Sequence, residues 1–67
     1  MTVQINGSPQ SIEPDLTIAQ LVEDRCGPGA QGVAVAVNGS VLRKSQWEQT
    51  AIEAGDEIEI LHATSGG

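Results

Sequence analysis

The chain has few of the residues that small proteins often use for covalent or chemical support. Among 67 residues there is one cysteine, Cys26, one aromatic residue, Trp47, and one histidine, His62, with no tyrosine or phenylalanine. A single cysteine excludes an internal disulfide, a zinc site built from several thiolates and an iron–sulfur cluster. An unpaired thiol also favours a reducing compartment, so we expect a cytoplasmic protein.

Basic residues are scarce as well. Three Lys and Arg stand against nine Asp and Glu, so the formal net charge is −6. Nucleic acid is therefore a poor partner, because binding it requires cationic side chains that release counterions from the phosphates. The charge favours a partner with a basic or mixed docking face, although it also serves solubility alone.

Long apolar runs are missing too, and we expect no signal peptide. No apolar stretch approaches the roughly 20 residues of a membrane span, and Met1 leads directly into an alternating strand pattern. We therefore expect no membrane partner. A chain of 67 residues has room for a single domain.

The first residues predict a β-hairpin at the margin of a sheet. Residues 2–5 alternate in polarity, as in a half-buried strand, and Asn6-Gly7 is a dipeptide preferred in type I′ turns. The return strand is weaker and covers residues 10–13, with Ile12 facing inward. Because Pro9 fits at a strand start or on an edge, we expect this second strand at the sheet margin.

One amphipathic helix follows. Thr17 is a suitable N-cap, Gln20 completes a capping box, and Gly27-Pro28 ends the helix. Its apolar stripe consists of Ile18, Leu21, Val22 and Cys26. The place of Cys26 on this stripe indicates a structural side chain rather than a nucleophile. We interpret the glycine-rich residues 29–32 as a connector, because they lack the lysine of a phosphate-binding loop.

The clearest strand covers residues 33–37. Its valines take one face, while Ala34 and Ala36 leave the other face unusually smooth. Asn38-Gly39 predicts a second hairpin, with a short return strand over residues 41–43.

The remaining residues predict a helical turn and a last strand. Ser45, followed three residues later by Glu, has the spacing of a capping box, and we place Trp47 at the end of the core. After a turn at residues 54–56, the strand 57–60 directs isoleucines inward and glutamates outward. Leu61 is then an apolar residue on the acidic face.

The order of these elements favours one arrangement of the sheet. A helix between two hairpins crosses over the sheet, and the last strand finds a parallel partner in the first. We therefore expect an α+β fold of the β-grasp type, a mixed sheet of about five strands in the order 2-1-5-3-4 packed on one main helix. Residues 1–63 form the domain, and residues 64–67 form a flexible tail that ends on two glycines.

Several stretches together resemble the ThiS family, the sulfur-carrier proteins of thiamine biosynthesis. The resemblance covers nearly the whole chain and is carried by residues 33–39, Arg43, Trp47, Gly55-Asp56 and the terminal Gly66-Gly67. The combination is fairly specific, whereas each piece alone is common. The sequence departs from the family pattern at Leu42, where a proline is frequent, and at Thr64-Ser65, where the approach to the glycines is usually more apolar.

The resemblance implies a ubiquitin-like fold and a function at Gly67. An E1-like adenylyltransferase would use ATP and magnesium to adenylate the Gly67 carboxylate. Sulfur from a persulfide protein would then displace AMP, and thiazole synthase would receive the sulfur of the resulting thiocarboxylate. Ser65, Gly66 and Gly67 would enter the partner's active site, while the carrier itself would supply no catalytic residue and bind no metal or cofactor.

The body of the domain would then provide docking energy. We hypothesise that Leu61, Ala34 and Ala36 form the dock and that Arg43 anchors its edge. The alternative for Arg43 is an ordinary surface ion pair, worth less than about 1 kcal/mol.

Other functions fit the same residues. A related β-grasp carrier delivers sulfur to molybdopterin, cysteine or tRNA, and a ubiquitin-like modifier forms an isopeptide through Gly67. A plain interaction module with an idle tail is a third class. An independent enzyme is disfavoured, because His62 has no evident partner for acid–base chemistry.

Overall fold

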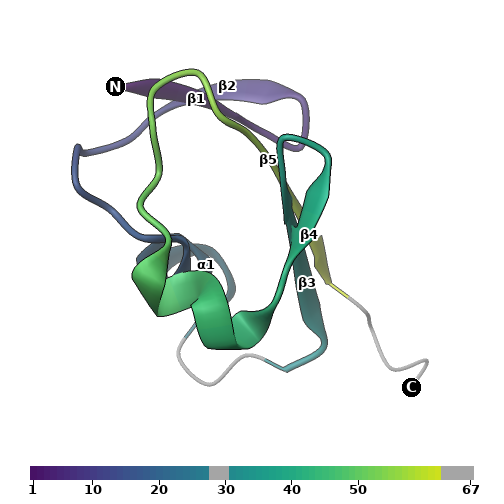
Figure 1. The fold of residues 1–67 in the computed structure, drawn as a ribbon. Coiled ribbons are helices and arrows are strands. Elements are labelled where there is room, and N and C mark those ends of the chain that lie inside the picture. Colours follow the sequence, from purple (N-terminus) through teal and green to yellow (C-terminus); the bar gives the residue numbers. More distant parts are fainter. Residues whose placement is uncertain (28–30, 63–67) are drawn as a thin grey trace.

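The computed structural model describes residues 1–27 and 31–62. Over these residues, a five-stranded mixed sheet in the order β2-β1-β5-β3-β4 packs on one α-helix (Figure 1). This is the predicted β-grasp architecture with the predicted strand order, so both predictions are confirmed. Pro28, part of the predicted connector and the predicted tail 64–67 lie outside the described residues.

The first hairpin joins β1 (Thr2–Ile5) to β2 (Ser8–Ser11) in antiparallel register. The prediction of a return strand over residues 10–13 was wrong by two residues, because Pro9 lies inside β2 opposite Gln4. Met1 and Ile12 exchange both backbone hydrogen bonds at 2.8 Å. Gln4 and Pro9 therefore form a pair that exchanges none, and the missing N–H of Pro9 faces away from β1. The predicted marginal position of this strand is confirmed.

Helix α1 (Ile18–Cys26) begins and ends where the sequence predicts. The Thr17 hydroxyl accepts a hydrogen bond from the Gln20 amide at 3.2 Å, and the Gln20 side chain accepts one from the Thr17 amide at 2.9 Å. Gly27 ends the helix at φ 90°, a backbone angle that residues with a Cβ rarely adopt. Three of the four predicted stripe residues are buried, and Cys26 is half-buried against the same core.

The second hairpin joins β3 (Val33–Val37) to β4 (Ser40–Leu42). The predicted bounds of β3 are confirmed, and β4 begins one residue earlier than predicted. The Asn38 side chain accepts a hydrogen bond from the Glu57 amide at 3.0 Å and donates one to the Asp56 carboxylate at 3.1 Å. The turn of the second hairpin is thereby fixed to the start of the last strand.

A 3-10 helix, η1 (Lys44–Gln49), follows β4. The predicted capping box at Ser45 was wrong, because the helix begins one residue earlier and no side chain caps it. Trp47 is buried, and its Nε1 donates a hydrogen bond to the Leu42 carbonyl at 3.0 Å. Its predicted place in the core is therefore confirmed.

The last strand, β5 (Glu57–His62), lies in the centre of the sheet, parallel to β1 and antiparallel to β3. Its inner side chains join a core between the sheet and α1, where η1 also packs (Figure 1). None of the described helices is long and apolar enough to cross a bilayer. The buried core consists of Val3, Ile5, Ile18, Leu21, Val22, Val35, Trp47, Ile52 and Ile58.

Candidate functional site

The predicted reacting group, the carboxylate of Gly67, follows β5 in the sequence. Gly67, Gly66 and Ser65 lie outside the described residues, so their predicted role stays a prediction. The described chain reaches His62, the final residue of β5. Because β5 pairs with β1 at its start and with β3 through His62, the strand that precedes these residues is anchored in the middle of the sheet.

The outer face of the sheet, which α1 leaves uncovered, brings the predicted docking residues together. Ala34 lies opposite Leu61 across the β3–β5 pair, and Ala36 lies opposite Glu59. Side chains at such paired positions are in contact distance, with Cβ atoms about 5 Å apart. Leu61 is 62% exposed, which is unusual for a leucine in the central strand of a sheet.

Sequence reasoning missed one member of this surface. Val41 of β4 lies opposite Ala36 and is 81% exposed, more than any other large apolar side chain among the described residues. The signal was present, because a two-residue turn at Asn38-Gly39 fixes the hairpin register and places Val41 on the face of Ala36. We call Ala34, Ala36, Val41 and Leu61 the outer patch.

Charged side chains flank the outer patch on two sides. Glu57 and Glu59 of β5 are exposed and alternate with the inward Ile58, so they share the outer face with Leu61. Arg43 is exposed just beyond β4, and its extended backbone continues the alternation that turns Val41 outward. The predicted position of Arg43 at the edge of the patch therefore agrees with the geometry, and its docking role stays a prediction.

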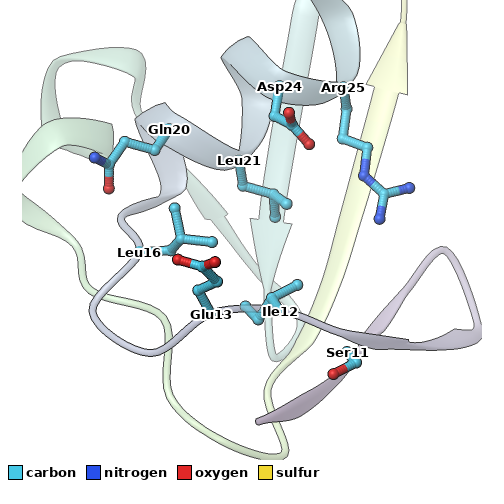
Figure 2. Close-up of a pocket in the computed structure, with 8 residues that line it drawn as sticks. All are labelled: Ser11, Ile12, Glu13, Leu16, Gln20, Leu21, Asp24 and Arg25. Carbon is cyan, nitrogen blue, oxygen red and sulfur yellow. The ribbon is translucent and has the colours of Figure 1, made fainter.

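A cavity of about 430 Å³ lies elsewhere, between α1 and the segment that connects β2 to it (Figure 2). Figure 2 shows the side chains of Ile12, Leu16 and Leu21 converging below the helix, with the carboxylates of Glu13 and Asp24 beside them. Ser11 also lines the cavity, but the residues that line this cavity include no His, Lys or Cys that would activate the Ser11 hydroxyl.

Other chemical arrangements are equally weak in the described part of the chain. Both carboxylates of the cavity belong to exposed residues, unlike the desolvated acids of most active sites. Residues 1–27 and 31–62 contain no group of three or more His, Cys, Asp or Glu that could hold a metal ion. His62 ends β5, two residues beyond the predicted strand 57–60, and lies opposite Val33. The described geometry thus favours presentation of an outer surface over chemistry in a pocket.

Comparison with known proteins gives a consistent result. The ThiS family model matches residues 3–67. A crystal structure of a thiamine biosynthesis protein (ThiS) from Geobacter metallireducens is 29% identical, with a TM-score of 0.83 and full coverage of both chains. A solution structure of a thiamine biosynthesis protein from the same organism gives a TM-score of 0.82 at 29% identity, covering all of this chain and 88% of that one.

A curated relative extends the comparison. A thiazole synthase from Paramagnetospirillum magneticum is 31% identical over 67 residues, which is the whole of this chain and 20% of that protein. The chain thus spans a fifth of the length of this relative.

Proposed function

The chain belongs to the ThiS family, and from that premise we propose that it is a sulfur carrier of thiamine biosynthesis that acts through the carboxylate of Gly67. The observation that carries the proposal is the extent of the family match, which runs through residue 67 and so includes the diglycine end. Members of this family are small carrier proteins, so partner enzymes supply the catalytic groups. A cytoplasmic location belongs to the same proposal.

The chemistry at Gly67 proceeds in two stages. A carboxylate is a poor acyl donor, so its oxygen first attacks the α-phosphate of ATP on an E1-like adenylating enzyme, and pyrophosphate leaves with magnesium. The terminal sulfur of a persulfide then displaces AMP from the acyl adenylate. This forms a new C–S bond and gives an acyl disulfide that keeps the S–S bond of the persulfide. A thiol then attacks the donor's sulfur and cleaves that S–S bond, which leaves a thiocarboxylate on Gly67 and a disulfide on the donor side.

The carrier contributes access and docking to this scheme. Glycines at positions 66 and 67 carry no Cβ, so they fit a channel that excludes larger residues. The outer patch supplies apolar area, while the flanking acidic residues and Arg43 fix orientation. The chain itself binds no cofactor or metal in this proposal; ATP and magnesium belong to the partner.

Thiazole synthase is the acceptor that we propose for the sulfur. Support comes from the relative named thiazole synthase, in which one fifth of the sequence aligns with this entire chain. A sequence similar to this chain within a protein of that name supports thiazole synthase as the partner. Molybdopterin, cysteine and tRNA have no such support from the comparisons.

Intact-protein mass spectrometry tests the proposal. The chain is incubated with an E1-like adenylating enzyme of the same genome, ATP, magnesium and a persulfide donor. We expect a mass gain equal to replacing one oxygen by sulfur, and no gain in a chain that ends at Gly66. A covalent adduct to lysine would identify a modifier instead, and full activity of the chain without Gly67 would identify an interaction module.

Transfer to the acceptor is tested in the same preparation. The thiocarboxylate form is mixed with thiazole synthase and its other substrates, and we expect the mass to return to that of the carboxylate. A thiocarboxylate that thiazole synthase leaves intact would contradict the choice of acceptor but not the role as a sulfur carrier.

A further inference from the structure

The parallel pairing between β1 and β5 stops before β5 itself ends. Backbone hydrogen bonds join Gln4 to Asp56 and Asn6 to Ile58, each at 2.9 Å, and the paired register stops at Ile58. After Asn6 the chain turns away into the first hairpin, whereas β5 continues to His62. The next backbone groups of β5 on this edge would therefore lack a strand partner.

The side chain of Asn6 takes the place of the missing strand. Its Oδ1 accepts a hydrogen bond from the Ile60 amide at 2.8 Å, and its Nδ2 donates one to the Ile60 carbonyl at 3.2 Å. One side-chain amide thus satisfies both backbone groups of Ile60, which two separate peptide units of a neighbouring parallel strand would otherwise pair. The two residues are separated by 54 positions in the sequence.

Few residue types can fill this position. Asn6 has φ 52°, a left-handed backbone conformation that Gly and Asn tolerate best. Glycine has no side chain to reach Ile60, and aspartate offers acceptors alone, so a carboxylate oxygen would face the Ile60 carbonyl. Asparagine supplies the backbone angle, the acceptor and the donor together.

This pair of hydrogen bonds controls the end of β5. Ile60 immediately precedes Leu61 of the outer patch, and six residues separate it from Gly67. Without Asn6, this end of β5 would be held by β3 along one edge and free along the other. Strand ends with one paired edge open more readily than strands paired on both sides.

We propose that Asn6 is a positioning residue for the reaction at Gly67: by holding Ile60 on both backbone groups, it fixes the direction in which β5 delivers the C-terminal residues to the adenylating enzyme. This inference rests on the proposed function and adds a residue to it. Leu61 of the outer patch remains paired with Ala34 of β3 without Asn6, so we expect the effect on orientation, in the turnover step, and not on the affinity of the carrier.

The second hairpin provides a matched control. Asn38 also precedes a glycine and has φ 51°, and its side chain also makes two hydrogen bonds to β5 and the turn before it, at Glu57 and Asp56. These contacts lie at the start of β5 rather than at its end. Asn6→Gly and Asn38→Gly therefore keep the same turn and remove the same amide, at opposite ends of one strand.

Hydrogen exchange and steady-state kinetics test the proposal together. In Asn6→Gly we expect the Ile60 amide to exchange about tenfold faster, with Asn38→Gly showing its acceleration at Glu57. We expect kcat for adenylation to fall about five- to tenfold in Asn6→Gly, with KM for the carrier within about twofold of the parent. Asn38→Gly should keep kcat within about twofold, although both variants lose similar thermal stability.

Four results would overturn the inference. Unchanged Ile60 exchange in Asn6→Gly removes the structural basis, and this measurement needs no partner enzyme. An equal loss of kcat in Asn6→Gly and Asn38→Gly would mean that Asn6 contributes only to stability. An unchanged kcat in Asn6→Gly, despite faster exchange of the Ile60 amide, would mean that the hydrogen bonds do not affect presentation of Gly67. If no adenylating enzyme accepts the parent chain, both the proposed function and the positioning role are wrong. The exchange of the Ile60 amide still shows, in that case, whether the hydrogen bonds from Asn6 protect it.

Discussion

Leu61→Asp is the sharpest test of the outer patch. The side chain is 62% exposed, and complete burial of a leucine contributes about 1.5–3 kcal/mol. Covering the exposed part against a partner therefore contributes about 1–2 kcal/mol, or roughly 5- to 30-fold in affinity. The introduced carboxylate adds a desolvation cost, so we expect KM of the adenylating enzyme for the carrier to rise about 10- to 100-fold.

The free carrier should tolerate this change, because the Leu61 side chain contributes little to the core. We expect the urea midpoint of Leu61→Asp to remain close to that of the parent chain. Gln4→Asp is the matched control, since Gln4 is exposed on the outer face of β1 opposite Glu57. Along β5 that pair lies four residues from Leu61, roughly 13 Å at the usual rise per residue.

The KM is measured by the exchange of pyrophosphate into ATP that the adenylating enzyme catalyses when the carrier is present. The docking hypothesis predicts a large rise in KM for Leu61→Asp and a small one for Gln4→Asp. A KM within about twofold of the parent for Leu61→Asp, in a chain that remains folded, would refute the reasoning. Equal effects of the two variants would mean that added charge, not the loss of apolar contact, is responsible.

Three further changes test the same structure. Val41→Asp should raise KM in the same direction, because Val41 is 81% exposed beside Ala36, and an unaffected KM would confine the dock to β3 and β5. Ile58→Ala should destabilise the domain by about 2–5 kcal/mol in urea denaturation, since the side chain is 1% exposed, and a loss below about 1 kcal/mol would contradict its central place in the core. Thr17→Ala should cost about 0.5–2 kcal/mol by the same measurement through loss of the N-cap, and an unchanged midpoint would show that the cap is dispensable.

The strand order was predictable because the sequence contains strong local signals at each change of direction. Two Asn-Gly turns, one capping box and the alternation of valine and alanine left few ways to connect the elements. The position of β2 was less predictable. A proline normally argues against a strand. Pro9 fits inside β2 because its nitrogen points away from β1, and that direction is set by the register of the pair.

The candidate site was predictable in part. Alternation alone placed Ala34, Ala36 and Leu61 on the outer face, and the described register confirms these positions. Val41 was missed because its face follows from the length of the turn rather than from its own neighbours. The role of Asn6 was missed for a different reason: the turn already accounted for an asparagine, and the contact with Ile60 spans 54 positions. The capping box at Ser45 failed because a 3-10 turn began one residue earlier.

The central place of β5 has a consequence for the order of events during synthesis. Before β5 is made, the chain contains two hairpins that share no strand contact, because both join the sheet through β5. Isolated two-stranded hairpins are marginally stable in water. A nascent chain therefore completes its core once the residues of β5 have emerged from the ribosome, and fragments that stop short of β5 present unpaired strand edges to proteases. Formation of the folded domain thus requires synthesis of the chain through residue 62, the end of β5.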